Sequence, residues 1–406
     1  MRKGVHIIVA AAAAGAVVLT GCSSSKKSST TQSSSSSAST SASASDTSSA
    51  STTPSDTAST TPTETSTAAA PPPAGGKVDG KGAKVGIILP DTQSSNRWVA
   101  ADPQLLKQAC KDDNLSCDIQ NGNGSAAKQK TIAQQMAAQK IKVLLLVNLD
   151  PASGAAIEQE ATKNGIITVD YDRLTPKGGA ALYVSFDNTK VGALQGKALT
   201  QCPQVKGKSS VKYVDINGAP TDNNATLFKT GYDSVLSKAS GWKKVGDQTG
   251  EWKPEVATRV FNAFIQKNKD INAVMVANDT MAAAVIARLQ DLNLAGKVAV
   301  SGQDAQASGL QYIMSGQQCF TIYKPSSGEA IPAIAAAAKL ANGQLPDTHG
   351  VTIEDPVTHK KVPAILAAPQ VITKANVAKP INDGYTAKSQ TCTGKYVALC
   401  KAAGVK

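Results

Sequence analysis

Residues 165–173, with the sequence GIITVDYDR, join a short apolar run directly to a group of polar side chains. The β-branched part of this stretch is typical of a buried strand. It ends in Asp170, Tyr171, Asp172 and Arg173, and packing alone gives no reason to gather two carboxylates and a guanidinium there. In open α/β sheets, ligands bind just outside the carboxyl ends of the strands. We therefore expect the rest of the chain to build a cleft around this strand end.

The chain from residue 84 onward alternates short β-branched runs with amphipathic segments of helical length. The expected strands are 85–89, 143–147, 166–169, 211–216, 273–277, 298–301 and 319–323, and the expected helices are 105–110, 126–138, 155–163, 191–200, 254–268, 282–292 and 330–341. Strands that alternate with helices indicate βαβ units and a mostly parallel sheet. Because this region is longer than one hydrophobic core usually serves, the pattern predicts an α/β fold with two domains.

The first 80 residues differ from the rest in composition. Residues 1–22 carry Arg2 and Lys3, an Ala-rich apolar run too short to span a bilayer comfortably, and the closing sequence LTGC. This ending resembles the lipobox of bacterial lipoproteins, which implies lipid attachment at Cys22; the alternative is an ordinary secretion signal with an incidental cysteine. Residues 23–80 consist largely of Ser, Thr, Ala and Pro, which predicts a disordered tether. We expect an extracytoplasmic protein, anchored to the cell membrane by lipid.

The formal net charge of +12 raises the question of nucleic-acid binding. The chain has no dense Lys/Arg run and few aromatic residues among its basic ones, and its signal directs it out of the cytoplasm. We therefore expect no nucleic-acid partner. A solvated basic surface beside an anionic cell envelope accounts for the charge.

The cysteines after Cys22 agree with export. Six of them remain, and an even number outside the cytoplasm indicates disulfides, although six cysteines allow fifteen connectivities. The expected pairs are Cys110–Cys117, Cys202–Cys319 and Cys392–Cys400. Because no histidine stands at metal-ligand spacing beside them, we expect no zinc site, no other metal and no cofactor.

Polar residues follow most of the predicted strands, as they follow residue 169. The groups are Asp91 with 96–98, then 172–173, 221–224, 251–252, 277–279, 302–304 and 323–325. If the strands are parallel, these groups meet at one face of each sheet. Carboxylates and amide oxygens accept hydrogen bonds from hydroxyls, Arg, Lys and amide NH₂ groups donate to them, and Trp rings cover C–H faces. The set therefore suits a neutral polyol.

Each of these residues also has a purely structural interpretation. Asp222, Asn278 and Asp279 are placed to cap the helices that follow them. Asp172 and Arg173 alone could form a structural ion pair, either tryptophan alone could belong to the core, and residues 324–325 alone could be a turn. Recurrence of the same chemistry at successive strand ends favours a binding site.

Several short motifs, taken in order, resemble a known family. They are 96–98 (NRW), 170–173 (DYDR), 184–188 (VSFDN), 222–225 (DNNA), 245–248 (VGDQ), 277–279 (AND), 301–304 (SGQD) and 323–325 (YKP). Together they resemble the D-xylose-binding family of bacterial ABC transporters, within the ribose/galactose-type (type I) periplasmic binding proteins. The resemblance covers roughly residues 84–385. The six cysteines, the tail from Cys392 and the loop 349–361 are not part of the family pattern.

The resemblance implies two Rossmann-like lobes with parallel sheets, joined by a hinge of three crossings. The crossings are expected near residues 187–188, just after Lys324, and near 362–366. The first lobe would hold 84–187 plus 325–362, the second 188–324 plus 363–385, and 386–406 would form a Cys-containing tail. The sugar-binding residues implied by the resemblance are Arg97, Trp98, Asp172, Arg173, Asp222, Asn224, Trp252, Asn278, Asp304 and Lys324, with Trp98 and Trp252 as ring platforms.

These expectations together predict the substrate-binding lipoprotein of an ABC sugar importer. It would bind a monosaccharide, D-xylose or a related aldose, by hinge closure. Its partners would be the permease subunits and, through the lipid, the membrane, and we expect a monomer. A sugar sensor for a membrane receptor is the alternative, because both functions use the same closure. An exported glycosidase using Asp172 and Asp304 is disfavoured, because neighbouring Arg and Lys keep such carboxylates ionised. A cytoplasmic repressor is disfavoured by the export signal and by the lack of an N-terminal helix-turn-helix.

Overall fold

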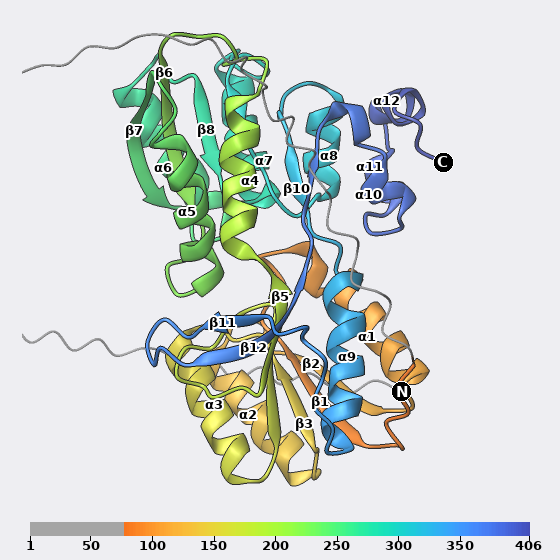
Figure 1. Ribbon diagram of the computed structural model, residues 1–406. Coiled ribbons are helices and arrows are strands. Elements are labelled where there is room, and N and C mark those ends of the chain that lie inside the picture. The colour runs from red at the N-terminus through yellow and green to blue at the C-terminus, as the bar shows by residue number, and fades with distance from the viewer. Residues whose placement is uncertain (1–76) are drawn as a thin grey trace, which may run out of the picture. The chain divides into compact units, whose positions relative to one another are not determined.

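The computed structural model describes residues 77–406, which contain three sheets (Figure 1). The first sheet has seven strands. Its order is β11-β12-β5-β4-β3-β1-β2. The strands are β1 (Lys84–Leu89), β2 (Ser116–Asn121), β3 (Val143–Leu146), β4 (Ile167–Tyr171), β5 (Leu182–Phe186), β11 (Thr352–Glu354) and β12 (Lys361–Ala367). All of them are parallel except β11, which pairs antiparallel with β12.

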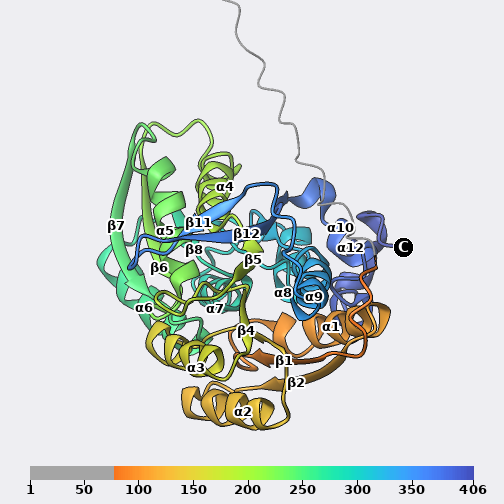
Figure 2. The same ribbon diagram turned by 60° about the horizontal axis from the view of Figure 1, so that its bottom comes forward.

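Helices cover both faces of this first sheet (Figure 2). Its helices are α1 (Ala101–Asp112), α2 (Ala126–Ala138), α3 (Pro151–Lys163) and α9 (Ser327–Ala341). Successive residues of β3 alternate between the two cores: Val143 and Leu145 pack with α1 and α9, and Leu144 and Leu146 pack with α2 and α3. This period of two explains why a strand buried on both faces reads as a continuous apolar run.

The second lobe is built on a parallel sheet with the order β7-β6-β8-β9. Its strands are β6 (Val211–Asn217), β7 (Trp242–Thr249), β8 (Ala273–Val276) and β9 (Ala299–Val300), and its helices are α4 (Asn188–Thr200), α5 (Asn223–Leu236), α6 (Pro254–Lys267), α7 (Asp279–Asp291) and α8 (Ala307–Met314). One continuous core joins these strands to α4, α5, α6 and α7. The third sheet is an antiparallel pair, β10 (Thr321–Tyr323) with β13 (Gln370–Ile372).

The chain passes between the two lobes at three places. β5 ends at Phe186 in the first sheet, and α4 begins at Asn188. β10 ends at Tyr323, and α9 then packs on the first sheet. β12 pairs with β5 as far as Ala367, and β13 then pairs with β10. The expected boundary at residue 363 is therefore wrong by several residues: it falls inside β12, whose backbone completes the hydrogen bonding of β5.

The C-terminal residues pack against the second lobe. They form α10 (Lys379–Asn382), α11 (Lys388–Thr391) and α12 (Tyr396–Ala402). Cys400 lies in a core with Leu310 and Ile313 of α8, and Gln311 donates to the carbonyl of Thr391 at 2.9 Å. The segment 386–406, expected as a tail, is thus a packed part of this lobe.

The sequence pattern missed strands at sheet edges. β2 and β7 are half-buried and carry polar residues, so they lack the apolar run that marks β1 or β3. β5 was also missed, although all of its residues are buried.

The three expected cysteine pairs are the three disulfides of the structure, and that prediction is confirmed.

The expected signal, the lipid site Cys22 and nearly all of the expected tether lie outside the described residues. The end of the expected tether is bound to the first lobe, because the Gly80 amide donates to the Asp113 carbonyl at 2.7 Å and the Val78 amide to its carboxylate. None of the helices between residues 77 and 406 has the length and apolar character needed to cross a membrane.

Candidate functional site

A small pocket lies between the carboxyl ends of the strands of the two lobes, and it collects the polar residues singled out in the sequence. All ten expected site residues line it: Arg97, Trp98, Asp172, Arg173, Asp222, Asn224, Trp252, Asn278, Asp304 and Lys324. Four further residues, Ser94, Ser95, Phe228 and Gln303, complete the wall. We call this the inner pocket. Its volume is about 30 Å³.

Asp172 is held at the end of β4 by both lobes. Its backbone is left-handed, with φ of 65°, and its carbonyl accepts from the hydroxyl of Ser185 at 2.7 Å and from Nδ2 of Asn224, in the second lobe, at 2.9 Å. Arg97 Nη1 donates to its carboxylate at 2.9 Å. A non-glycine residue in this conformation is strained and persists only where its surroundings fix it. In this backbone conformation the Asp172 side chain lines the inner pocket.

Arg97 is the centre of a buried charge cluster. Its guanidinium donates to Asp102 at 2.7 and 2.9 Å and also pairs with Glu329, on the first turn of α9. Burial raises the pKa of Glu329 to about 8, as do Asp172 and Asp102, while Arg97 opposes the rise. Since one cation faces three carboxylates, keeping Glu329 protonated at neutral pH lowers the repulsion among them. Tyr171, which received no role from the sequence, donates its hydroxyl to Asp102 at 2.5 Å.

Arg173 and Asp222 meet across the lobes, with Arg173 Nε 3.2 Å from Asp222 Oδ2. The same carboxylate oxygen accepts from Trp252 Nε1 at 3.2 Å. Burial raises the pKa of Asp222, and Arg173 opposes that shift. The Trp252 ring also packs edge-on against Phe228, with 6.4 Å between centroids. This tryptophan is therefore oriented by one hydrogen bond and one aromatic contact.

Near the hinge, Asp304 of the second lobe also forms a contact across the lobes and lies beside a cation. Ser95 of the first lobe donates to its Oδ2 at 3.2 Å, and Lys324 Nζ lies 3.2 Å from its Oδ1. Its backbone is left-handed, with φ of 87°. Asn278 links the lobes beside it, since its Nδ2 donates to the Ser94 carbonyl at 3.1 Å. The lobes are thus joined by polar contacts at the pocket itself.

Some buried polar atoms of the pocket form no hydrogen bond. They are Arg173 Nε, Gln303 Oε1 and Asp304 Oδ1. The first and last lie near opposite charges, but neither contact has hydrogen-bond geometry. A buried polar atom without a partner costs about 1–3 kcal/mol. Their grouping in one pocket indicates a place where a ligand with hydroxyl groups supplies the missing partners.

Asn278 and Asp222 each cap a helix and also line the inner pocket, so the structural and the functional interpretation both hold for them. Asn278 Oδ1 caps α7 by accepting from the Met281 amide at 3.0 Å, while its Nδ2 group lines the pocket. Asp222 Oδ1 caps α5 by accepting from the Asn224 amide at 2.9 Å, while its Oδ2 faces Arg173. A side chain with two polar atoms serves both the helix end and the site.

Sequence reasoning missed several participants. Gln303 lies inside the quoted 301–304 motif but was not chosen, and its place directly before Asp304 was the available signal. Glu329 and Asp102 were missed because they act through Arg97 and neither follows a strand. Asp170, at the same strand end as Asp172, accepts from the Thr175 amide and hydroxyl and does not line the pocket.

Away from the pocket, three carboxylates of the second lobe, Asp215, Asp233 and Asp247, lie within 4.8 Å of one another. Lys244 Nζ lies 2.6 Å from Asp215 and 2.5 Å from Asp233, and Lys229 Nζ lies 2.6 Å from Asp247. These ammonium groups neutralise much of the carboxylate charge. The cluster is therefore explained as an ion-pair network.

Comparison with known proteins relates this architecture to binding proteins. The family described as "Periplasmic binding protein domain" matches residues 85–345. The D-xylose-binding periplasmic proteins of Escherichia coli (strain K12) and Haemophilus influenzae are each 33% identical to the chain. Each alignment covers 76% of this chain; it covers 93% of the Escherichia coli protein and 92% of the Haemophilus influenzae protein.

A solved structure is similar over the same region. It is a carbohydrate transporter solute binding protein from Chloroflexus aurantiacus in complex with D-glucose, with 27% identity and a TM-score of 0.68 over 75% of this chain and 97% of that one. The family and these relatives are binding proteins, which confirms the expected fold class and the expectation that the chain is not an enzyme. The chain belongs to the periplasmic binding protein domain family, as a two-lobed member of type I.

Proposed function

We propose that this protein is the substrate-binding lipoprotein of an ABC sugar importer and that a neutral monosaccharide binds in the inner pocket. The observation that carries the proposal is the convergence of ten predicted side chains, with Arg173 Nε, Gln303 Oε1 and Asp304 Oδ1 left without hydrogen bonds. Hydroxyl groups both donate and accept hydrogen bonds, so one sugar can supply the missing hydrogen bonds of the carboxylates and of the guanidinium. The sugar-binding names of the relatives support the same class of ligand.

The preferred ligand in this proposal is D-xylose or a closely related aldose. Two relatives are named for D-xylose, whereas the similar solved structure holds D-glucose. The names of these two relatives favour a pentopyranose, which lacks the exocyclic hydroxymethyl group of a hexose. Selectivity would come from buried charges, since a sugar without a required hydroxyl leaves a carboxylate or guanidinium unpaired.

Binding requires the pocket to open and close again. Arg173–Asp222 and Ser95–Asp304 join opposite lobes, so separating the lobes at the three crossings breaks them and frees both walls. Sugar hydroxyls would then insert between the paired charges as the lobes return. The closed form would be the one that the permease recognises. Lipid attachment at Cys22 would keep the protein beside that permease, as a monomer on the outer side of the membrane.

The test is calorimetric titration of the mature protein with D-xylose, L-arabinose, D-ribose, D-glucose and D-galactose. We expect saturable binding of an aldopentose at a stoichiometry of one, stronger than that of the matching hexose. A flat response to every monosaccharide would overturn the proposal. Lipid attachment is tested separately, by incorporation of radiolabelled palmitate into the full chain and its loss in Cys22→Ser.

A further inference from the structure

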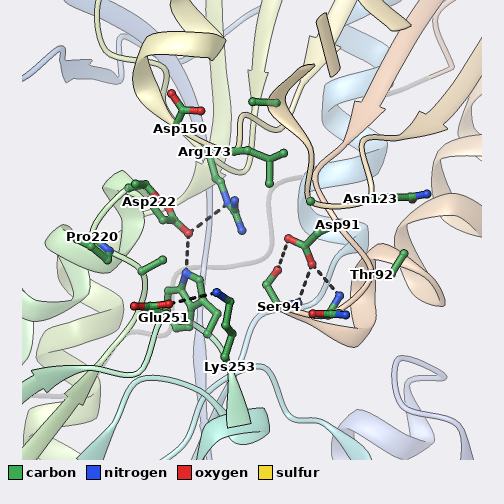
Figure 3. A pocket seen from close by; sticks show the side chains of 17 residues that line it. Asp91, Thr92, Ser94, Asn123, Asp150, Arg173, Pro220, Asp222, Glu251 and Lys253 are labelled. Atoms are coloured by element: carbon green, nitrogen blue, oxygen red, sulfur yellow. Dashed lines mark hydrogen bonds and ion pairs between the residues drawn. The ribbon is translucent and has the colours of Figure 1, made fainter. Parts of the chain in front are cut away.

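A second, larger space lies beside the inner pocket and is also lined by both lobes (Figure 3). We call it the outer chamber; its volume is about 650 Å³, within the range usual for ligand sites. Its walls come from the loops after β1, β2, β3 and β4 of the first lobe and after β6 and β7 of the second. In the second sheet β7 is the edge strand next to β6, so the chamber continues the cleft toward that edge.

The chamber and the inner pocket share a partition, formed by residues that line both spaces. Ser94, Arg173, Asp222 and Trp252 line both spaces. Figure 3 shows Arg173 and Asp222 facing each other between the lobes. The same Asp222 carboxylate accepts a hydrogen bond from Trp252 Nε1. Because Arg173 Nε forms no hydrogen bond in this arrangement, a hydroxyl placed between Arg173 and Asp222 would improve its contacts.

Trp252 is built into this partition. It and Glu251 both have left-handed backbones, with φ of 59° and 55°. The indole lies so close to Gly218 that a Cβ there would be 2.0 Å from its ring. The left-handed backbone and the need for glycine at position 218 indicate that the fold holds the indole ring in one place. The ring lines both spaces, so a ligand extending from one into the other would contact it.

The charges of the chamber select a neutral ligand. Four carboxylates line it, Asp91, Asp150, Asp222 and Glu251, against the two cations Arg173 and Lys253. Most are already paired: Asp91 accepts from the Gln93 and Ser94 amides, Asp150 from Ser153, and Glu251 from Lys253. An uncompensated anion would meet net negative charge. This charge balance disfavours a phosphorylated or acidic sugar and suits a neutral polyhydroxy group.

We propose that the outer chamber holds the second sugar residue of a short neutral oligosaccharide whose first residue occupies the inner pocket. This inference rests on the proposed function and extends the ligand class from monosaccharides to disaccharides. Once the lobes separate enough for the inner pocket to admit a first sugar ring, the outer chamber has the size and polarity for a second ring. Arg173, Asp222 and Trp252 line both spaces and would lie beside the linkage.

The test compares each monosaccharide with its β-1,4-linked disaccharide by calorimetry: D-xylose with xylobiose, and D-glucose with cellobiose. Two variants fill the chamber from opposite lobes at exposed positions outside the inner pocket, Thr92→Trp and Pro220→Trp. The matched control is Thr131→Trp, an exposed position on α2 that lines neither space.

We expect a wild-type disaccharide affinity within about tenfold of that of its monosaccharide. The filling variants should weaken disaccharide binding by at least about tenfold and change monosaccharide binding by less than about twofold. The control should change neither. If monosaccharides bind but neither disaccharide does, or if filling the chamber leaves disaccharide binding intact, the inference is wrong and the proposed function stands. If neither monosaccharide nor disaccharide binds, both fail.

Discussion

Arg173 of the first lobe lies with its Nε 3.2 Å from Oδ2 of Asp222 in the second lobe, and both side chains are buried. Arg173 Nη1 also donates to the Asn148 carbonyl at 3.1 Å, which anchors it to its own lobe. The pair therefore joins the two halves of the cleft at the point where the inner pocket meets the outer chamber. It is both an interlobe contact and part of the proposed sugar site.

The first prediction concerns that pair. Arg173→Ala should weaken sugar binding about ten- to a hundredfold, because a hydrogen bond to a charged group contributes roughly 1.5–3 kcal/mol and Asp222 loses its cation. Asp304→Ala should act in the same way, since it removes the acceptor beside Ser95 and Lys324. The measurement is titration calorimetry, with Arg288→Ala as a control because Arg288 lines neither space. Unchanged affinity in both site variants would contradict the assignment.

The second prediction uses the three tryptophans of the chain. Trp98 and Trp252 line the inner pocket, whereas Trp242 lies on β7 against Tyr213, with 5.6 Å between centroids. Saturating sugar should therefore change the intrinsic fluorescence, and Trp98→Phe or Trp252→Phe should remove much of that change. Trp242→Phe is the matched control and should retain it. A ligand signal that disappears only in the Trp242 variant would show that the sugar binds elsewhere.

The third prediction is a pH dependence caused by Glu329. Burial raises its pKa to about 8 in the folded protein, against about 4.3 in an unfolded chain. The folded state therefore holds more protons between these values, so the contribution of Glu329 to the free energy of unfolding falls as pH rises through this window. Asp170, Asp215 and Asp279 shift in the same direction, so a single profile does not separate them.

The variant Glu329→Gln isolates this effect because its amide has the shape of the protonated acid. At pH 5 its melting temperature should be close to that of the wild type. By pH 8.5 the variant should be the more stable protein, with the difference growing by at most about 1.4 kcal/mol per pH unit. Thermal denaturation across this range measures it, with the exposed Glu255→Gln as control. A difference that shrinks toward high pH would have the wrong sign.

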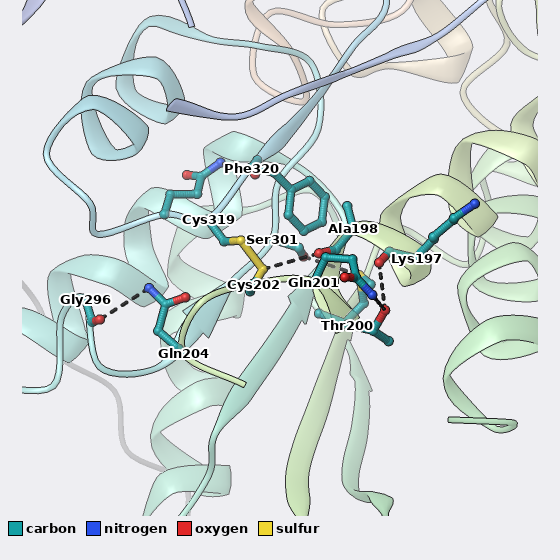
Figure 4. Close-up of a disulfide and its surroundings, with 12 residues drawn as sticks. Lys197, Ala198, Thr200, Gln201, Cys202, Gln204, Gly296, Ser301, Cys319 and Phe320 are labelled. Carbon is teal, nitrogen blue, oxygen red and sulfur yellow. Dashed lines mark hydrogen bonds between the residues drawn. A yellow bond between two sulfur atoms is a disulfide. The ribbon is translucent and has the colours of Figure 1, made fainter. Parts of the chain in front are cut away.

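The fourth prediction compares two disulfides. Cys202–Cys319 joins the loop after α4 to the segment before β10 and closes 117 residues of the second lobe (Figure 4). Cys392–Cys400 closes only 8 residues near the C-terminus. Chain entropy assigns about 5 kcal/mol to the first loop and about 2.5 kcal/mol to the second. The double variant Cys202→Ser/Cys319→Ser should therefore melt at a lower temperature than Cys392→Ser/Cys400→Ser; the reverse order would contradict the entropic account.

The edge strands show where prediction from the sequence was weakest. β3 is buried on both faces, so hydrophobicity alone identifies it. β2 and β7 contain residues such as Asp118 and Asp247 that remain in contact with solvent, and their strand conformation depends on pairing with β1 and β6. The boundary at residue 363 failed for the same reason. Only the pairing of β12 with β5 shows to which lobe those residues belong.

The sequence by itself determined the alternation of strands and helices, the expectation of two domains and the polar residues at successive strand ends. The resemblance to a known family selected the ten residues of the inner pocket, and the three cysteine pairs were one choice among fifteen connectivities. The alternation and the polar strand ends follow from local composition, and parallel strands bring their carboxyl ends to one edge wherever each strand lies in the chain. The tertiary structure alone decided which atoms pair. Arg97 contacts Asp172 and Glu329 from 75 and 232 residues away, and those contacts depend on side-chain direction. The partition at Arg173, Asp222 and Trp252, which divides the cleft into two spaces, arises in the same way, because it exists only when both lobes are assembled.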